Sequence, residues 1–290
     1  MLAVLVGCGR FGFDPLGGDG GSSADACAFG PWGTPERIPE LSSTSDDFGG
    51  QISVDGLTYY FRSNRSGNGD LYYAQRTTRD AAFGPVIALT TLNTGFDEIE
   101  IAPSPDELEV YYSSSAVAAT QCLFHASRTD RALAFSNITR FDSFCATSAA
   151  VGAFVTLDNL TLYYTLESGM GPEGTILVTT RAATGDTFVV GTPVVGLEGM
   201  PNKGYPVLTP DGLTIYFEAA ISGMNQLFQA TRASTSSPFG SILPIPGINE
   251  PGAVAEDVSI TTDGVELFFA SLRADSTGKD DFYVAKRACL

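Results

Sequence analysis

The stretch DGLTYYF at residues 55–61 decides the fold of this chain, because four further copies of it follow at a nearly constant spacing. The copies are DELEVYY at 106–112, DNLTLYY at 158–164, DGLTIYF at 211–217 and DGVELFF at 263–269. Their leading aspartates are 51, 52, 53 and 52 residues apart. A repeat of about 50 residues built from strand-like segments is typical of the blades of a β-propeller.

Each copy starts with a turn and continues into an apolar run. The Asp-Gly pairs at 55, 211 and 263 and the Asp-Asn pair at 158 are hairpin-turn signals. The aromatic and branched residues that follow prefer strands, and their continuous apolar character indicates a strand buried on both faces. We therefore expect the turn to join the innermost strand of each blade to the second strand. The five aspartates are expected to be structural, since such turn residues recur for backbone reasons.

A second motif, a strand that ends in arginine, follows each first motif. The five arginines are Arg76, Arg128, Arg181, Arg232 and Arg287. Phenylalanine stands seven residues after each of the first four, at Phe83, Phe135, Phe188 and Phe239. Arg287 lacks such a partner, whereas an unpaired Phe-Gly-Pro segment stands at residues 29–31. We therefore predict an all-β, five-bladed propeller with four strands per blade, in which an N-terminal strand at Phe29 closes the last blade and removes an exposed edge.

The first residues differ from the repeats. Residues 1–7 are apolar, and the sequence LVGC at 5–8 resembles the bacterial lipobox, in which the cysteine is lipid-modified after cleavage before it. An incidental cysteine in a hydrophobic N-terminus is the alternative. Residues 8–26 are rich in Gly, Ser and Asp and are expected to be a flexible tether. We predict a signal-peptide remnant at 1–7, a tether at 8–26 anchored through Cys8, and a propeller at 27–290. Gly9 after Cys8 implies, through the same resemblance, sorting to the outer membrane, on its periplasmic or surface face.

Four further cysteines allow three disulfide pairings. The repeat places Cys27 and Cys289 at the two ends of one tight turn between third and fourth strands, which lie within about 7 Å of each other. Cys122 begins a third strand, and Cys145 precedes the next innermost strand on the same face of the ring. We predict the bonds Cys27–Cys289 and Cys122–Cys145. Unpaired, buried cysteines are the alternative, which an extracytoplasmic location disfavours.

Residues 53–76, SVDGLTYYFRSNRSGNGDLYYAQR, resemble the WD-like repeat of TolB-type propellers. That repeat joins a Ser-Pro-Asp-Gly turn, an apolar strand, a Ser-x-Arg segment and an Asp-Leu-Tyr strand. The matching residues are Asp55, Gly56, Tyr60, Phe61, Ser63, Arg65, Gly69, Asp70, Leu71 and Tyr72. The last copy matches through Asp263, Gly264, Phe268, Phe269, Ser271, Arg273, Asp281 and Tyr283. The resemblance implies a propeller, and it names no ligand.

Acidic side chains precede several of the expected innermost strands, so they should converge on one mouth of the central channel. They are Asp46, Asp47, Asp97, Glu98, Glu100, Glu256 and Asp257. Five-bladed glycosidases use carboxylates on similar segments, and paired carboxylates can hydrolyse glycosidic bonds. Asp47, Glu98 and either Glu256 or Asp257 are therefore the catalytic candidates. Three converging carboxylates could also hold calcium, here at Asp47, Glu98 and Asp257. Solvated loop charges are the remaining alternative.

The charge balance restricts the partners. The chain has 16 basic and 33 acidic residues and a net charge of −17, which disfavours nucleic acid, and contact with a membrane is expected through the lipid anchor only. The single histidine, His125, lies within a predicted strand and is expected to be an ordinary strand residue. We predict a non-enzymatic cell-envelope lipoprotein without a cofactor that binds a protein or an envelope polymer. The alternatives are a glycoside hydrolase or glycan-binding protein that uses the acidic mouth, and a purely structural repeat protein.

Overall fold

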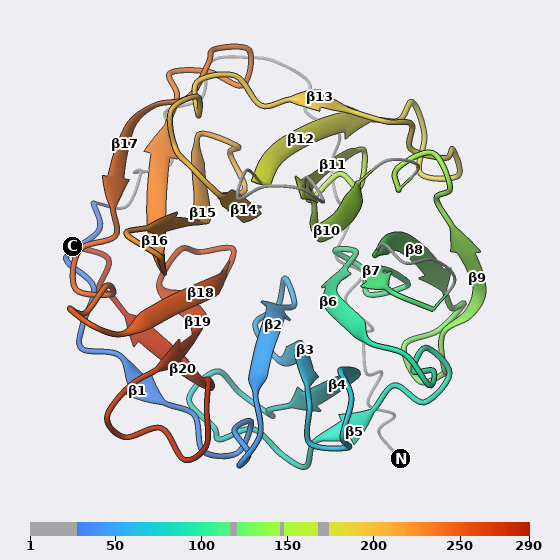
Figure 1. Ribbon diagram of the computed structural model, residues 1–290, viewed down its shortest axis with the longest axis horizontal. Helices are drawn as coiled ribbons and strands as arrows, with labels where there is room; N and C mark the ends of the chain where they lie inside the picture. The colour runs from blue at the N-terminus through green and yellow to red at the C-terminus, as the bar shows by residue number, and fades with distance from the viewer. Residues whose placement is uncertain (1–27, 117–120, 146–147, 168–173) are drawn as a thin grey trace, which may run out of the picture.

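The computed structural model describes residues 28–116, 121–145, 148–167 and 174–290. In these residues, twenty strands form five antiparallel sheets of four strands each, which stand around a central axis (Figure 1). The predicted five-bladed propeller with four strands per blade is confirmed. The predicted signal-peptide remnant, Cys8, the tether at 8–26 and Cys27 lie outside the described residues. In the described part of the chain, no helix has the length and apolar character needed to cross a membrane.

Each blade is one sheet whose strands follow one another from the axis outward. The innermost strands are β2 (Asp47–Ile52), β6 (Glu98–Pro103), β10 (Ala149–Val155), β14 (Lys203–Leu208) and β18 (Val254–Ile260). The second strands are β3 (Thr58–Ser63), β7 (Glu109–Ser114), β11 (Thr161–Glu167), β15 (Thr214–Ile221) and β19 (Glu266–Leu272). The third strands are β4 (Asp70–Gln75), β8 (Cys122–Ser127), β12 (Gly174–Thr180), β16 (Met224–Thr231) and β20 (Asp281–Lys286). The outer strands are β5 (Ile87–Ala88), β9 (Ser136–Arg140), β13 (Thr192–Pro193), β17 (Gly240–Pro244) and β1 (Glu36–Arg37). We number the blades 1 to 5 in the order of their innermost strands.

The repeated turn joins the innermost strand to the second strand, as predicted. In blade 1, the Asp55 carboxylate accepts hydrogen bonds from the Ser53 hydroxyl at 2.6 Å and from the Leu57 amide at 3.0 Å. The same two contacts recur in the other four turns. The residue after each aspartate has a positive φ, and these residues are Gly56, Glu107, Asn159, Gly212 and Gly264. The five aspartates therefore stabilise turns.

The arginine at the end of each third strand fastens that strand to the turn and to the outer segment. Each Nε atom donates a hydrogen bond of 2.6 to 2.9 Å to a backbone carbonyl of the turn. In the first four blades, the guanidinium lies over the phenylalanine seven residues later, 4.2 to 5.0 Å from the ring centroid. In blade 5, Arg287 lies 3.7 Å over Phe29. The N-terminal segment thus supplies the stacking partner that the end of the chain lacks.

The N-terminal segment also supplies the outer strand of blade 5, as predicted, although the strand starts later than expected. Glu36 pairs with Val284 and Arg37 with Tyr283, whereas Phe29 forms only an isolated bridge to Cys289. Pro31 lies between the bridge and the strand and has no N–H to donate, which explains why pairing is not continuous. The ring is closed by hydrogen bonds between the two ends of the chain (Figure 1).

The core is divided into five clusters, one between each pair of neighbouring blades. Between blades 5 and 1, the rings of Tyr59 and Phe61 meet Phe282 edge-on at centroid distances of 5.2 and 5.1 Å. Such pairs add about 1 kcal/mol each to the free energy gained from burying apolar area. The strands are buried on both faces because each blade has a neighbour on either side.

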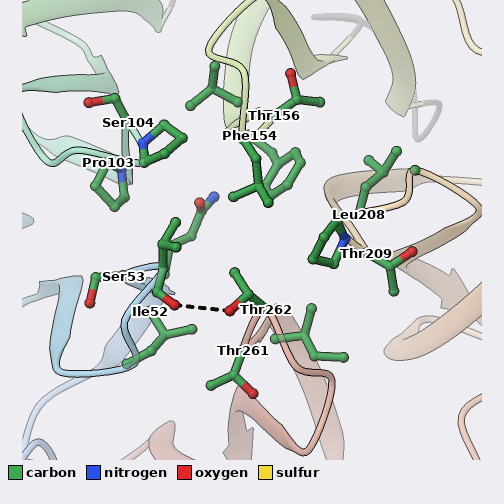
Figure 2. Close-up of a pocket in the computed structure, with 18 residues that line it drawn as sticks. Ile52, Ser53, Pro103, Ser104, Phe154, Thr156, Leu208, Thr209, Thr261 and Thr262 are labelled. Carbon is green, nitrogen blue, oxygen red and sulfur yellow. Dashed lines mark hydrogen bonds between the residues drawn. The ribbon is translucent and has the colours of Figure 1, made fainter. Parts of the chain in front are cut away.

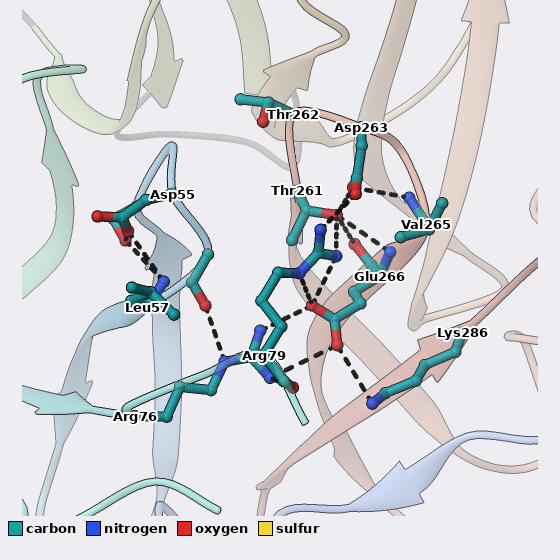
Figure 3. Close-up of polar contacts among 12 residues, drawn as sticks. Asp55, Leu57, Arg76, Arg79, Thr261, Thr262, Asp263, Val265, Glu266 and Lys286 are labelled. Atoms are coloured by element: carbon teal, nitrogen blue, oxygen red, sulfur yellow. Dashed lines mark hydrogen bonds and ion pairs between the residues drawn. The ribbon is translucent and has the colours of Figure 1, made fainter. Parts of the chain in front are cut away.

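An ion network links blade 1 to blade 5 beside the turns (Figure 3). The Glu266 carboxylate lies 2.7 Å from Arg76, 2.8 Å from Arg79 and 3.3 Å from Lys286. Arg79 also pairs with Asp263. Burial acts to raise the pKa of Glu266, but the hydrogen bonds and charges of Arg76 and Arg79 outweigh it and lower that pKa.

The predicted Cys122–Cys145 disulfide is present, with the two Cα atoms 5.0 Å apart. It ties the start of β8 to the segment before β10. Cys289 is also disulfide-bonded. Its predicted partner Cys27 lies outside the described residues, so that pairing stays a prediction.

Candidate functional site

Every innermost strand is interrupted by a β-bulge at the same repeat position, where the register to the second strand shifts. At each bulge one residue has a positive φ, and these residues are Gly49, Glu100, Gly152, Tyr205 and Asp257. Bulges redirect side chains and are frequent beside active sites. A positive φ in a non-glycine residue costs about 1 to 3 kcal/mol and is concentrated at functional sites. Glu100, Tyr205 and Asp257 therefore mark this end of the axis as the candidate site.

The two glycines among the bulge residues make room for their neighbours. A Cβ atom on Gly49 would lie 2.7 Å from Oε1 of Glu100, and one on Gly152 would lie 2.8 Å from Cδ1 of Tyr205. The side chains of Glu100 and Tyr205 thus occupy space that a side chain on the preceding blade would need.

An open cavity lies at this end of the axis. Its volume is about 510 Å³ when the adjoining open solvent is included. We call it the acidic mouth, because its lining includes five carboxylic acids, namely Glu100, Glu167, Glu218, Glu256 and Asp257. Among the described lining residues, Arg62 is the only cation. The Arg62 guanidinium lies over the Phe48 ring, 4.1 Å from its centroid, and 3.9 Å from Asp97.

Three of the acids form a contact chain across blades 2, 4 and 5. Oε2 of Glu218 accepts a hydrogen bond from the Asp257 amide at 3.2 Å. Oδ2 of Asp257 accepts one from the Gly49 amide at 3.0 Å. The carboxyl groups of Asp257 and Glu100 are hydrogen-bonded to each other. All three acids are buried, so their charges are poorly screened by solvent.

The remaining two acids are held by neutral donors. The Tyr205 hydroxyl donates to Oε1 of Glu167 at 3.2 Å, and Nδ2 of Asn225 donates to Oε2 of Glu256 at 2.9 Å. The Tyr205 amide donates to the Thr165 hydroxyl at 2.8 Å, which fixes the bulge of blade 4 against blade 3.

Burial and mutual repulsion keep protons on this cluster. Burial, the charge of Asp257 and that of Glu218 raise the pKa of Glu100 well above its usual range. Burial and the charges of Asp257 and Glu256 do the same for the pKa of Glu218. Burial, with Asp257 nearby, raises the pKa of Glu256 to about 8. Burial raises the pKa of Asp257 to about 6, although hydrogen bonds from Gly49 and Glu100 act against the rise. At neutral pH the mouth thus holds both carboxylic acids and carboxylates.

The structure brings together only part of the predicted set. Glu256 and Asp257 line the acidic mouth, but Asp47 and Glu98 do not. Asp47 is fully buried and pairs with Arg65 at 2.8 Å. Glu98 is fully buried and accepts hydrogen bonds from Thr94 and Ser114.

Asp47 and Glu98 are therefore occupied in holding loops, and this corrects their prediction as members of one catalytic set. The predicted calcium trio of Asp47, Glu98 and Asp257 is not assembled either. Among the described residues, no group of three His, Cys, Asp or Glu side chains has a geometry that could hold a metal ion.

Glu167, Tyr205 and Glu218 were not predicted as site residues. The sequence signal for Glu218 is its position inside the otherwise apolar segment Tyr216–Ala220, seven residues after the leading aspartate of the repeat. Arg62 has the same repeat position in blade 1. His125 lies in β8, half-buried, with its ring 5.2 Å from that of Tyr111, and it does not line the acidic mouth.

The other end of the axis is different in chemistry. A pocket of about 660 Å³ including open solvent, which we call the apolar mouth, lies there. It is lined by residues from the ends of all five innermost strands, such as Ile52, Pro103, Phe154 and Leu208 (Figure 2). None of its lining residues is titratable. Most of its serine and threonine hydroxyls donate to the aspartates of the turns, as Ser53 does to Asp55, whereas the Thr262 hydroxyl donates to the Val54 carbonyl at 3.0 Å. Between these two pockets on the axis, only the acidic mouth is lined by titratable side chains.

The fold and this site together define the class of protein, which is a five-bladed β-propeller with an acidic pocket at one end of its axis. No protein-family model and no curated protein sequence matches the chain. Among solved structures, it is similar to TolB from Acinetobacter baumannii, at 14% identity and a TM-score of 0.51, over 86% of this chain and 56% of TolB. The chain thus spans little more than half the length of that protein.

Two glycoside hydrolases are similar over nearly their whole length. The endo-arabinase from Bacteroides thetaiotaomicron has 12% identity and a TM-score of 0.58, over 86% of this chain and 95% of the enzyme. The catalytic domain of the Coprinopsis cinerea GH62 alpha-L-arabinofuranosidase has 10% identity and a TM-score of 0.58, over 90% and 98%. At these identities the likenesses establish the fold, and they include both TolB-like proteins and glycoside hydrolases.

Proposed function

We propose that this protein is a non-enzymatic, lipid-anchored protein of the bacterial cell envelope that binds a glycan segment of an envelope polymer in the acidic mouth. Carboxylates, amides and a tyrosine hydroxyl converge there on an open cavity, and such groups form hydrogen bonds with sugar hydroxyls.

The observation that carries the proposal is the shared hydrogen bond between the Glu100 and Asp257 carboxyl groups. Glycosidases keep their two carboxyl groups about 5 to 9.5 Å apart, so that the scissile bond fits between them. Here the two groups are in contact, and Asp257 is further bound by the Gly49 amide. This arrangement suits recognition better than cleavage.

The test is binding of purified propeller to isolated envelope polysaccharide and to glycan fragments released from it, measured by co-sedimentation and calorimetry. Glu100→Gln should weaken binding about tenfold, as expected for the loss of one hydrogen-bonded contact. Glu40→Gln, at an exposed position far from the mouth in sequence, is the matched control and should bind like the unmodified protein. Equal binding by all three proteins, or none to any envelope glycan, contradicts the proposal.

The lipid anchor has a separate test. Metabolic labelling with palmitate should mark the full-length protein and should be lost in Cys8→Ala. Labelling that persists in Cys8→Ala contradicts the proposed lipidation of Cys8 and does not bear on the proposed glycan binding.

A glycoside hydrolase is the second candidate function, and the raised pKa of Glu256 favours it. With that pKa at about 8 and the pKa of Asp257 at about 6, one carboxyl is protonated and the other ionised at pH 7. A general acid beside an ionised carboxylate is the pair that glycoside hydrolysis requires. Two similar structures carry the names of an endo-arabinase and an alpha-L-arabinofuranosidase. Release of reducing sugar from arabinan, abolished in Glu256→Gln, would establish this function in place of the first.

A further inference from the structure

The acidic mouth has an excess of carboxyl groups over cations. Five carboxylic acids line it, and Arg62 is the only cation among its described lining residues. The Arg62 guanidinium faces the Phe48 ring, donates to Asn64 at 3.3 Å and lies 3.9 Å from Asp97. It therefore also interacts with groups other than the five acids of the mouth. A ligand that brings positive charge would relieve the repulsion among the acids.

An unsatisfied polar atom also points to a missing partner. The Tyr59 side chain is fully buried, and its hydroxyl has no hydrogen-bond partner among the described residues. This hydroxyl lies beside the innermost strand of blade 1, since a Cβ atom on Gly50 would lie 2.4 Å from it. The charges of Asp257 and Glu100 act on the same hydroxyl. Buried hydroxyls are rarely left without a partner, so this atom indicates that a polar ligand group or water belongs nearby.

The geometry favours an ammonium group over a metal ion. A divalent metal needs several oxygens at about 2.3 Å, and no such group of side chains exists in the described part of the chain. An ammonium group instead donates three hydrogen bonds of ordinary length to separate acceptors. The ring of Tyr205, on a bulge at the mouth, is suited to contact with a cation or with a sugar face.

We propose that the acidic mouth recognises a protonated primary amine, and that the ligand unit is an amino sugar with a free amine. This inference rests on the proposed glycan-binding function and names the sugar class. The ammonium group lies among Glu100, Glu218 and Asp257. The hydroxyls of the sugar meet the side-chain amides of Gln121 and Asn225, which both donate and accept hydrogen bonds.

The experiment compares two oligosaccharides of equal length by calorimetry at pH 6. One is a β-1,4-linked glucosamine tetramer with free amines, and the other is its fully N-acetylated counterpart. We expect the free amine to bind at least about tenfold more tightly, because acetylation removes one charge-assisted contact. Raising the salt concentration should change this binding only modestly, because the three acids are buried and buried charge pairs are screened much less than exposed ones.

Two variants test the residues. Glu218→Gln should reduce the affinity for the glucosamine tetramer about tenfold while keeping an acceptor for the Asp257 amide. Glu167→Gln, at a less buried acid, should reduce it as well and serves if Glu218→Gln fails to fold. Glu40→Gln should leave the affinity unchanged.

The outcomes separate this inference from the proposed function. Equal affinity for the two tetramers, or preference for the acetylated one, contradicts recognition of a protonated amine but leaves the proposed glycan binding intact. If neither tetramer binds while envelope polysaccharide does, the inference alone fails. If the polysaccharide fails too, both fail. A tetralysine peptide is the last probe, and tighter binding of that peptide than of the glucosamine tetramer overturns the assignment to a sugar.

Discussion

Gly49 and Glu100 occupy matching positions in neighbouring blades, yet only Glu100 carries a side chain into the acidic mouth. The five bulge positions hold two glycines, two acids and a tyrosine, all with a positive φ. A symmetric backbone feature thus carries an asymmetric set of side chains. The glycines matter as much as the acids, because the Glu100 carboxylate fills the space beside Gly49.

We predict that Gly49→Ala lowers the free energy of unfolding by about 1 to 3 kcal/mol, since the new methyl group needs a positive φ and meets the Glu100 carboxylate. Urea unfolding measures the change. Gly95→Ala is the control, because nothing lies within 4 Å of its Cβ position and its φ is not in the positive region. A loss of stability in Gly95→Ala as large as that in Gly49→Ala would show that the contact with Glu100 is unimportant.

The raised pKa of Glu256 predicts a stability that declines with pH. The usual pKa near 4.5 applies to the unfolded chain, and burial with the charges of Asp257, Asp280 and Asp46 raises it to about 8 in the folded state, against a hydrogen bond from Asn225. Between these values the folded protein binds more protons than the unfolded chain. The free energy of unfolding therefore falls as the pH rises from about 4.5 to 8, by up to about 1.4 kcal/mol per unit of pKa shift.

Urea unfolding at pH 5 and pH 8 tests this linkage. The unmodified protein should be less stable at pH 8, and Glu256→Gln should reduce the difference, because the amide does not ionise. Asp257 and the other raised acids of the mouth contribute the slope that remains. An unchanged slope in Glu256→Gln would mean that this carboxyl does not hold its proton in the folded state.

The sequence predicted the site less well than it predicted the elements around it. Glu256 and Asp257 could be named because acids before an innermost strand should reach the channel. Asp47 and Glu98 followed the same reasoning and failed. They lie two residues before the bulge positions Gly49 and Glu100, where their carboxyl groups bond loops instead. A bulge adds one residue and changes the side-chain direction, and a regular alternation cannot reveal it.

At the scale of elements, strands and turns were predictable because the same turn and strand residues recur in all five repeats. The turn aspartate, the apolar second strand and the stacked arginine all lie where the repeat places them. The start of the closing strand could not be predicted. The Phe29 ring stacks on Arg287, but strand pairing begins only at Glu36. Backbone hydrogen bonds already form at Gly30 and Gly33, but regular strand pairing starts only at Glu36.

The ion network between blades 1 and 5 predicts a strong effect of one carboxylate. Glu266→Ala would leave the guanidinium groups of Arg76 and Arg79 without their shared partner (Figure 3). Breaking a buried pair from one side costs about 3 to 5 kcal/mol, with the partial exposure of Arg79 favouring the lower value. Thermal and urea unfolding should both detect the loss.

The control for Glu266→Ala is a surface pair at the same blade junction. Lys279→Ala removes an exposed partner of Asp46 and should leave the stability nearly unchanged. Equal stability in both variants would contradict a structural role for the network.

At the scale of the whole molecule, closure of the ring depends on contacts between the two ends of the chain. Five blades could be predicted from five repeats. The closure of the last blade by the N-terminal segment was inferred because Arg287 has no phenylalanine seven residues later. The structure places Phe29 on that arginine and pairs β1 with β20. The segment also buries Ile38 and Leu41 against the core between blades 5 and 1.

We therefore predict that a chain beginning at residue 42 is unstable and prone to aggregate. It loses two buried aliphatic side chains, each of which contributes about 2 to 5 kcal/mol, and it exposes the unpaired edge of β20. It also lacks Cys27, the predicted disulfide partner of Cys289. A chain beginning at residue 26 keeps the closing segment and should melt near the temperature of the full-length protein. Size-exclusion chromatography and thermal melting separate the two. If the chain beginning at residue 42 remained monomeric and equally stable, the ring would be held by contacts between blades alone, and the pairing of the two ends would be dispensable.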